Sequence, residues 1–512
     1  MLLSKLLYDS GLEYDIYTHD SELLRLSASG TDIKDIFCDS RKVVVGGLYI
    51  AIEGVHTDSH AYVEEACEHG ACAAVISRNA LMDGRVRTGN CYIPLITVEN
   101  TREAYARLCA AWYSNPQKRL KLIGVTGTNG KTTVCSMIYH VMSSAGIRCG
   151  QIGTVGNISG GKALDIKNEN VCVNMTTPDP PELYRMLWQM AEDGVQYVIM
   201  EVTSHALALS KVAPIDFDVA VFTNLSEDHL DLHLNMERYF CEKQKLFSMC
   251  KHAVVNIDDK YGRRIVEGFS GEMCTLSAEG RTAQLQAVDV RYCMRSGTEF
   301  KLSSRKMRLR IKTVLPGSVN VINTLCAIAA LDACGVSPRD IKDGLASFVG
   351  VAGRFERLKL DPRVDFSVYI DYAHTPDALE NLLRTAKQIA KRGQRIVLVF
   401  GCGGDREKQK RAVMGRIASD MADVIVITSD NPRNESPMDI INDIILGVSD
   451  GAIYTVIEDR RAAIQYAIKN AQRGDIILLA GKGHEEYLID SHGRHPFSER
   501  EICRELVEKY CY

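Results

Sequence analysis

The sequence predicts an α/β protein of several domains with mostly parallel sheets. Uninterrupted apolar runs of strand length alternate along the chain with longer helical patterns, which is typical of βαβ units. Four of these runs in the last third of the chain end directly in a polar cluster, as strands do at the ligand-binding edge of a parallel sheet. A chain of 512 residues is too long for one ordinary core, so two to four domains are expected.

Three blocks follow from this pattern. Residues 1–112 hold short strand-like runs at 48–52 and 73–76. Residues 113–350 contain the buried-strand candidates 120–125, 197–202, 219–222 and 253–257, separated by helical patterns. Residues 351–512 form the third block, which begins at a glycine-containing joint near Gly350.

Composition and charge describe a soluble globular chain, with 46% apolar and 25% charged residues. The net charge of −4 gives no indication of a basic surface that would bind nucleic acid. No apolar run approaches the roughly 18 residues of a membrane span. The N-terminal pattern predicts a short amphipathic helix, and Asp9 interrupts it too early for a signal peptide. We therefore expect a cytoplasmic protein without membrane insertion. We also expect a monomer, although composition and charge do not determine the oligomeric state.

The 17 cysteines are odd in number and contain no C-x-x-C pair. Several of them, such as Cys109 and Cys326, lie within apolar segments. This usage predicts reduced cysteines in a cytosolic protein and no structural zinc.

The segment 126–133 predicts a phosphate-binding loop, because it follows an apolar strand and precedes a helical pattern at 134–144. Such a loop directs backbone N–H groups and a helix N-terminus at an anion. Lys131 would reach the terminal phosphates of ATP and Thr132 would hold Mg²⁺. The predicted ATP-binding residues of the loop are Gly127, Thr128, Asn129, Gly130, Lys131, Thr132 and Thr133.

The loop departs from the strict P-loop pattern, which requires glycine at the position of Val125; the glycine comes two residues later, at Gly127. The alternative interpretation is a Gly/Thr-rich turn without a ligand. The agreement of strand, loop, lysine and helix favours ATP.

Two further strand ends carry candidate metal ligands. Glu201 ends a buried strand, where a carboxylate beside a phosphate loop commonly binds Mg²⁺, although a salt-bridged glutamate is the alternative. His229 follows the next strand within a segment rich in oxygen and imidazole ligands, and we interpret it as a second metal contact rather than a structural histidine. Lys243 lies in a helical pattern whose chemistry alone predicts a solvated face.

In the third block, each of four strand-like runs is followed directly by a polar cluster. In a parallel sheet these clusters would lie together in one crevice beyond the carboxyl ends of the strands. The alternative is four ordinary turns. The clusters are 371–376, 401–406, 428–433 and 480–485.

The segments 126–133, 201–207, 224–231, 239–247 and 371–376 together resemble the ATP-dependent Mur ligases, which form amide bonds in peptidoglycan precursor synthesis. The resemblance spans nearly the whole chain. It implies an N-terminal α/β domain for UDP, a central P-loop ATPase-like domain with a parallel sheet, and a C-terminal Rossmann-like domain for the amino acid.

The resemblance also implies roles for residues that chemistry alone leaves open. Lys243 would be carbamylated, giving an anion that binds a second Mg²⁺ with His229, so the implied metal ligands are Thr132, Glu201, His229 and Lys243. The implied adenine and ribose contacts are Asn320, Asn323, Arg354 and Asp371.

The Asp430-Asn431-Pro432-Arg433 run resembles the signature of family members that add meso-diaminopimelate. Diaminopimelate carries a second carboxylate at its far end, which Arg433 and Arg406 could bind with paired hydrogen bonds. Gly481 would leave room and Glu485 would meet an ammonium group. L-lysine lacks the distal carboxylate, so a site built for that charge would reject it.

For the UDP-sugar substrate the resemblance covers fewer positions. Ser40 lies in an Asp-Ser-Arg motif, Thr176 and Thr177 match a family threonine pair, and Thr203 stands where many members have serine. Lys211 keeps the charge of an arginine found in some members, whereas Leu209 does not keep the amide of a glutamine.

The resemblance thus implies an ATP-dependent ligase that adds meso-diaminopimelate to UDP-N-acetylmuramoyl-L-alanyl-D-glutamate, with Mg²⁺ as cofactor and small molecules as its partners. The alternatives are the same reaction with lysine or another diamino acid, the addition of glutamate to folates, and a non-catalytic scaffold. The Asp-Ser-Arg motif and Arg433 speak against lysine and folate substrates, and the presence of every expected ATP and metal residue speaks against a scaffold.

Overall fold

The computed structural model describes residues 1–17, 30–54, 57–89, 92–164, 175–228, 230–293, 297–305 and 307–510. The chain divides into two compact units. The first comprises Met1–Gly124, Ile147–Asp218 and Glu242–Lys251, and the second comprises Val125–Gly146, Val219–Cys241 and His252–Tyr512.

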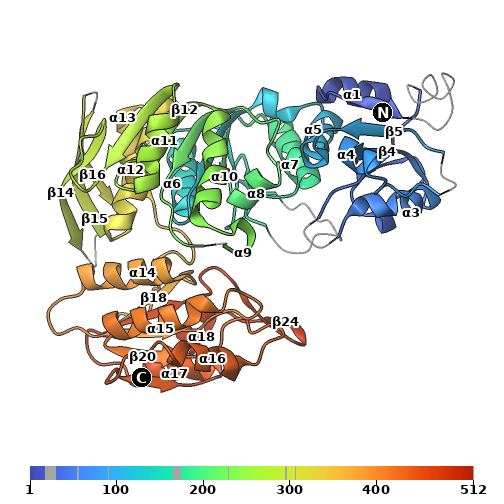
Figure 1. Ribbon diagram of the computed structural model, residues 1–512. Coiled ribbons are helices and arrows are strands. Elements are labelled where there is room, and N and C mark those ends of the chain that lie inside the picture. The colour runs from blue at the N-terminus through green and yellow to red at the C-terminus, as the bar shows by residue number, and fades with distance from the viewer. Residues whose placement is uncertain are drawn as a thin grey trace. The chain divides into compact units, whose positions relative to one another are not determined.

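The N-terminal segment forms a five-stranded sheet in the order β1-β5-β4-β3-β2 (Figure 1). The pairs β2–β3, β3–β4 and β4–β5 are parallel, and β1 runs antiparallel to β5. Buried apolar side chains of β3, β4 and α3 form a core on one face. The elements are α1 (Leu3–Ser10), β1 (Asp15–Tyr17), β2 (Asp35–Phe37), η1 (Ser40–Lys42), β3 (Gly47–Ile50), η2 (Ser59–Tyr62), α3 (Val63–Glu68), β4 (Ala71–Ser77), α4 (Arg78–Met82), β5 (Leu95–Val98), α5 (Thr101–Trp112) and η3 (Pro116–Arg119).

The central segment forms an eleven-stranded sheet in the order β16-β15-β14-β13-β12-β11-β6-β10-β7-β8-β9. The pairs β7–β10, β12–β13 and β13–β14 are parallel, whereas β14–β15, β15–β16, β7–β8 and β8–β9 are antiparallel. The elements are β6 (Lys121–Thr126), α6 (Lys131–Ser144), β7 (Cys149–Ile152), β8 (Ile158–Ser159), β9 (Lys162–Ala163), α7 (Pro180–Glu192), β10 (Tyr197–Glu201), α8 (Ser204–Ala208), β11 (Phe217–Phe222), α9 (Leu230–His233), α10 (Met236–Ser248), β12 (Cys250–Asn256), α11 (Lys260–Gly268), β13 (Glu272–Ser277), β14 (Leu285–Cys293), β15 (Gly297–Ser304), β16 (Arg308–Thr313), α12 (Ser318–Ala333) and α13 (Pro338–Ser347).

The C-terminal segment, orange to red in Figure 1, forms a six-stranded sheet in the order β17-β18-β22-β19-β20-β21. All its pairs are parallel except β17–β18. The elements are β17 (Glu356–Arg357), β18 (Ser367–Asp371), α14 (Pro376–Ile389), β19 (Ile396–Phe400), α15 (Gln409–Met421), β20 (Val424–Ile427), α16 (Pro437–Ile445), β21 (Tyr454–Val456), α17 (Arg460–Lys469), β22 (Ile476–Ala480), β23 (Tyr487–Asp490), β24 (Gly493–Pro496) and α18 (Glu499–Tyr510).

Alternation along the C-terminal strands explains why helices cover both faces of this sheet. In β19, Leu398 and Phe400 pack with helices α14, α15 and α16, while Val397 and Val399 pack with α17 and α18. A strand buried on both sides reads as a continuous apolar run, which is the pattern that predicted it. Polar residues then begin where each strand leaves the core.

The α/β class with parallel sheets is confirmed, and three expectations are corrected. The central sheet ends on both sides in antiparallel strands, so it is less parallel than predicted. Lys243 is 1% exposed, so the solvated face expected from its helical pattern is wrong. Cys67 is disulfide-bonded, so the expectation of reduced cysteines fails there, although thirteen other described cysteines form no disulfide.

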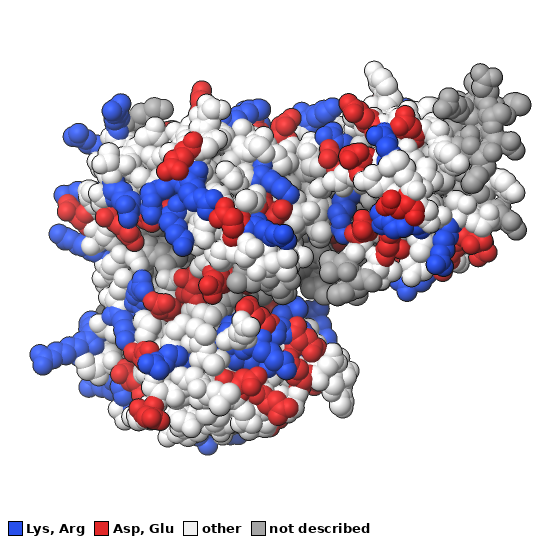
Figure 2. Space-filling view, viewed as in Figure 1, with Lys and Arg blue, Asp and Glu red and all other residues white. Residues whose placement is uncertain are grey.

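No helix among the described residues is long and apolar enough to cross a membrane. Figure 2 shows basic and acidic side chains interspersed over the viewed face.

Candidate active site

The phosphate loop connects β6 to the first turn of α6, and two of its glycines cannot be replaced by a residue with a side chain without strain or a steric clash. Gly127 and Gly130 have φ angles of +149° and +88°. A Cβ at Gly127 would lie 1.9 Å from Thr223 Oγ1, and one at Gly130 would lie 2.3 Å from Asn323 Oδ1. The loop therefore depends on glycine both for its conformation and for its close approach to neighbouring side chains.

Backbone and side-chain bonds fix the remainder of the loop. Asn224 Oδ1 accepts from the Asn129 backbone N–H at 2.9 Å, and the Thr128 hydroxyl donates to the carbonyl of Ser226 at 3.1 Å. Lys131 Nζ donates to the carbonyls of Gly127 and Thr128, each at 2.9 Å. The Lys131 side chain thus folds back onto the backbone of the phosphate loop.

The first turn of α6 is suited to an anion. Thr132 and Thr133 are buried there, and the helix is 14 residues long in all. The N-terminus of a helix of this length carries partial positive charge and backbone N–H donors. The predicted strand, loop and helix order is present.

The residues predicted to contact adenine and ribose lie in two clusters. At the start of α12, Asn323 Nδ2 donates to Asn320 Oδ1 at 3.1 Å, and Asn323 is the residue that abuts Gly130. Arg354 lies over the Tyr372 ring at 4.7 Å and donates to Thr132 Oγ1 at 3.3 Å. The structure therefore brings both asparagines and Arg354 to the phosphate loop.

Asp371 ends β18 and accepts hydrogen bonds from the backbone N–H groups of Phe355, at 2.6 Å, and Ala373, at 2.8 Å. Burial raises the pKa of this carboxyl, and Arg354 opposes that rise. Asp371 thereby anchors the segment that carries Arg354.

Asp377, in the first turn of α14, joins the phosphate loop although the sequence did not single it out. Its Oδ2 accepts from Asn129 Nδ2 at 2.5 Å and from Ser226 Oγ at 2.9 Å. Its place just after the 371–376 cluster was the only signal in the sequence.

In the first unit, Glu201 ends β10 as predicted and is 1% exposed. Its carboxylate accepts from the Thr154 backbone N–H at 2.8 Å and from the Thr154 hydroxyl at 3.2 Å. Thr177 donates to the Glu201 carbonyl at 2.8 Å and accepts from the Thr203 backbone N–H at 3.1 Å. Thr176 Oγ1 lies 3.1 Å from Thr154 Oγ1. The three predicted threonines thus gather beside Glu201.

Ser40 and Lys211 are the other two residues predicted to bind the UDP-sugar substrate. Both belong to the first unit, but each contacts different neighbours. Ser40 donates to Glu65 Oε2 at 2.6 Å. Lys211, only 7% exposed, forms an ion pair with Asp179 Oδ1 at 2.7 Å and a contact with Met175 Sδ at 3.3 Å. Among the residues that the structure describes, no hydrogen bond links Ser40 to the threonine cluster.

The donor set for a metal is only partly described. His229 lies outside the described residues. Within the described ranges, no group of three or more His, Cys, Asp or Glu side chains is arranged to hold a metal ion. Mg²⁺ commonly uses one or two carboxylates together with substrate phosphates and water. Each unit offers an oxygen donor of this kind: the buried Glu201 carboxylate in the first unit, and the Thr132 hydroxyl at the phosphate loop in the second.

The last two clusters of the C-terminal sheet meet around a buried lysine, Lys482. Its Nζ lies 3.2 Å from Asp430 Oδ1 and donates to Asn431 Oδ1 at 2.9 Å. Asn431 Nδ2 then donates to Glu485 Oε2 at 2.9 Å. Burial tends to raise the pKa of Asp430, yet Lys482 and Arg460 hold it below its ordinary value, whereas burial raises the pKa of Glu485.

Gly481 is required by this packing, because it has a φ of +117° and a Cβ there would lie 2.6 Å from Asp430 Oδ2. The space that glycine leaves is thus taken up by Asp430. Its predicted role in making room for an amino acid stays a prediction.

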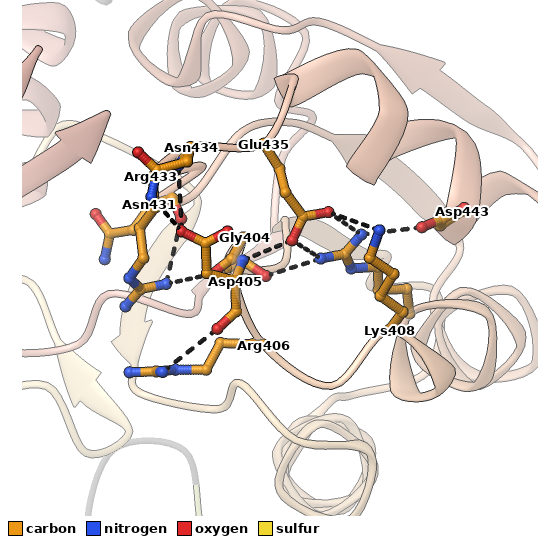
Figure 3. A network of polar contacts seen from close by, with 11 residues as sticks. Gly404, Asp405, Arg406, Lys408, Asn431, Arg433, Asn434, Glu435 and Asp443 are labelled. Atoms are coloured by element: carbon orange, nitrogen blue, oxygen red, sulfur yellow. Dashed lines mark hydrogen bonds and ion pairs between the residues drawn. The ribbon is translucent and has the colours of Figure 1, made fainter. Parts of the chain in front are cut away.

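Arg433 joins the cluster after β20 to the one after β19 (Figure 3). Its Nη1 donates to the carbonyl of Gly404 at 2.7 Å, and its own φ is +54°. The Gly404 N–H donates to the carbonyl of Asn431 at 2.9 Å, and a Cβ at Gly404 would lie 1.9 Å from the Pro432 carbonyl oxygen. Arg406 follows on the same loop and donates to the carbonyl of Asp405 at 3.4 Å. The two predicted arginines therefore stand on loops that are hydrogen-bonded to each other.

The sequence interpretation missed the charged residues beneath these loops. Arg411 is 0% exposed, and it pairs with Glu435 and Asp443. A signal was present, because Arg411 falls on the same helical face as the buried residues Met414 and Ala418.

Comparison with known proteins gives the same domain order. Residues 32–113 match a family described as "Mur ligase family, catalytic domain", residues 125–331 match "Mur ligase middle domain" and residues 353–483 match "Mur ligase, glutamate ligase domain".

Two relatives are similar over nearly the full length. A protein of Caldanaerobacter subterraneus subsp. tengcongensis named "UDP-N-acetylmuramoyl-L-alanyl-D-glutamate--2,6-diaminopimelate ligase" is 42% identical over 478 residues, covering 93% of this chain and 95% of the relative. A Clostridium tetani protein of the same name is 39% identical over 498 residues, covering 97% and 98%.

A solved structure titled as the same ligase aligns with a TM-score of 0.65 at 31% identity, covering 94% of this chain and 96% of that one. MurF ligase from Thermotoga maritima in complex with ADP aligns with a TM-score of 0.57 at 17% identity, covering 96% and 98%, and so shares the fold.

Proposed function

This chain belongs to the Mur ligase family, and from that premise we propose that it adds meso-2,6-diaminopimelate to the D-glutamate of UDP-N-acetylmuramoyl-L-alanyl-D-glutamate with conversion of ATP to ADP and phosphate. The observation that carries the choice of amino acid is the Asp430–Arg433 segment at the end of β20. The buried Lys482 holds the Asp430 carboxylate in place, and the Gly404 carbonyl of the neighbouring loop holds the Arg433 guanidinium.

The phosphate loop supports the ATP half of the reaction. Lys131 and the N-terminus of α6 neutralise the charge of the β- and γ-phosphates, while Asn320, Asn323, Arg354 and Asp371 hold the nucleoside. The side-chain carboxylate of D-glutamate attacks the γ-phosphorus, which gives an acyl phosphate and releases ADP. Positioning and charge neutralisation supply most of the catalysis in phosphoryl transfer.

The C-terminal cluster supports the amide-forming half. Arg433 and Arg406 bind the distal carboxylate of diaminopimelate and Glu485 meets its ammonium group, so that the other amine is presented to the acyl phosphate. That amine attacks the acyl carbonyl, and the tetrahedral intermediate loses phosphate to leave the amide. A substrate without the distal carboxylate would leave the two arginines without their partner.

Mg²⁺ would be held by Thr132, Glu201, His229 and a carbamylated Lys243, and would supply positive charge where the phosphoryl group is transferred. The burial of Lys243 supports the modification, because an uncharged amine is the form that reacts with CO₂ and burial disfavours a charged one.

The remaining assignments complete the proposal. Ser40, Thr176, Thr177, Thr203 and Lys211 would contact the UDP-sugar substrate. The UDP-binding domain would comprise residues 1–112, the ATP-binding domain 113–350 and the amino-acid domain 351–512, in a monomer that acts in the cytoplasm.

The test is ADP release by purified protein with ATP, Mg²⁺ and the UDP-linked dipeptide, comparing meso-diaminopimelate with L-lysine. Turnover with diaminopimelate alone is expected. Equal turnover with lysine would overturn the role given to Arg433, and no turnover with either amino acid would overturn the proposed reaction.

A further inference from the structure

A fully buried arginine lies beneath the loops that carry the proposed amino-acid site. Arg411, on α15, is 0% exposed. Its Nη1 and Nη2 donate to the two carboxylate oxygens of Glu435 at 3.0 and 2.8 Å, and Nη1 also donates to Asp443 Oδ2 at 2.9 Å. Glu435 comes two residues after Arg433, in the loop between β20 and α16.

The Arg411–Glu435 pair bonds to the backbone of the neighbouring loop. Glu435 Oε1 accepts from the Asp405 N–H at 2.5 Å, and Arg411 Nη2 donates to the carbonyl of Gly403 at 3.4 Å. These two bonds flank Gly404, whose carbonyl accepts from Arg433 Nη1. Arg433 Nη1 also donates to the Asn431 carbonyl at 3.4 Å, so the pair holds both sides of the nearer of the two carbonyls that bind the Arg433 guanidinium.

A second contact closes the arrangement at the surface. Asp405, with a φ of +52°, accepts at Oδ2 from the backbone N–H of Asn434 at 3.3 Å and from its side chain at 2.8 Å. Figure 3 shows Asp405, Asn434 and Glu435 around Gly404, with Arg406 and Arg433 on the same side of the network. Two loops with left-handed residues at Asp405 and Arg433 are thus held at a fixed spacing.

A stability role alone does not account for this arrangement. A buried ion pair often contributes little net stability relative to apolar residues, because desolvation offsets the attraction. The bonds here cross from one loop to the other and converge on the residues next to Arg433. Precise placement of a charged group by supporting hydrogen bonds is what a carboxylate-recognition site requires.

We propose that Arg411 and Glu435 are positioning residues that set the Arg433 guanidinium for the distal carboxylate of the amino-acid substrate, and so determine the preference for diaminopimelate over lysine. This inference rests on the proposed function. Neither residue contacts the substrate; both act through the Gly403–Asp405 backbone.

The test compares Glu435→Gln with Asp443→Asn as a matched control. Both changes remove one carboxylate partner of Arg411, but only Glu435 also bonds to the Asp405 backbone. For Glu435→Gln we expect KM for diaminopimelate to rise about 10- to 100-fold, with KM for ATP unchanged, since small displacements of a positioning group have effects of that size. The ratio of kcat/KM for diaminopimelate over lysine should fall in the same variant.

Asp443→Asn should leave the ratio of kcat/KM for diaminopimelate over lysine unchanged. Arg411→Lys keeps the positive charge but loses the paired N–H donors of the guanidinium, and it should lower the ratio less than Glu435→Gln does. A loss of thermal stability in Glu435→Gln with an unchanged ratio would overturn the inference, as would an equal fall of the ratio in Asp443→Asn. If the unsubstituted protein shows no turnover with diaminopimelate, the proposed function fails first and the inference falls with it.

Discussion

Replacing Lys482 by methionine should destabilise the C-terminal sheet strongly. Lys482 is 0% exposed, and its Nζ contacts Asp430 at 3.2 Å, Asn431 at 2.9 Å and the carbonyl of Tyr487 at 2.9 Å. Methionine retains most of the volume but leaves the Asp430 carboxylate without its nearest cation. Removing one partner of a buried pair costs about 3 to 5 kcal/mol. Arg460 also lowers the pKa of Asp430, so we expect about 3 kcal/mol.

Hydrogen exchange followed by mass spectrometry measures this loss locally, in the amides of β20 and β22. A change of about 3 kcal/mol corresponds to roughly a hundredfold faster exchange through local opening. The control is Lys251→Met, since Lys251 pairs with Asp218 at 2.7 Å but is 66% exposed, and should change stability by about 1 kcal/mol or less.

The double change Lys482→Met with Asp430→Asn separates the two possible causes. If the uncompensated carboxylate is the cause, the second substitution should restore most of the protection. Equal exchange in the single and double variants would refute this reasoning and assign the loss to packing instead.

Three further predictions concern single residues. Lys131→Ala should abolish ADP formation while leaving circular dichroism unchanged; substantial remaining turnover would count against the phosphate-loop assignment. Gly404→Ala should raise KM for diaminopimelate, because its Cβ would meet the Pro432 carbonyl oxygen at 1.9 Å; an unaltered KM would show that the loop is not part of that site. His484 has its pKa lowered from 6.5 to about 4 by burial and by Arg354 and Arg500, so between these pH values the unfolded chain binds a proton that the folded one does not. Stability should therefore rise with pH over that window by at most about 3 kcal/mol, in denaturant titrations, and His484→Gln should remove the slope.

The strands of the C-terminal sheet were predicted closely because their burial on both faces leaves an uninterrupted apolar run. The predicted clusters 401–406 and 428–433 begin at the residue directly after β19 and β20, respectively. The polar clusters that follow them were equally visible, since a change from apolar to polar residues marks the point where a strand leaves the core. The antiparallel edge of the central sheet was missed although β15 alternates, with Phe300 and Leu302 buried and Lys301 exposed.

Buried charges were the main failure of the sequence interpretation. In α10, Lys243 lies three to four residues from Tyr239, Phe240, Leu246 and Phe247, all of which are buried. A lysine within that stripe must face the interior, so the spacing of its apolar neighbours was a signal of burial that the interpretation from residue type did not use. The partners of such a charge come from distant segments, as Glu435 does for Arg411, and no local pattern identifies them.

The central claim is that phosphorylation by ATP activates the D-glutamate side-chain carboxylate before the amide bond forms. The measurement is the mass of phosphate released when the side-chain carboxylate of D-glutamate in the UDP-linked substrate carries ¹⁸O and meso-diaminopimelate is the acceptor. Attack of that carboxylate on the γ-phosphorus and later loss of phosphate from the tetrahedral intermediate should place one ¹⁸O in each phosphate. Unlabelled phosphate, released with formation of the amide product, would contradict the acyl-phosphate account.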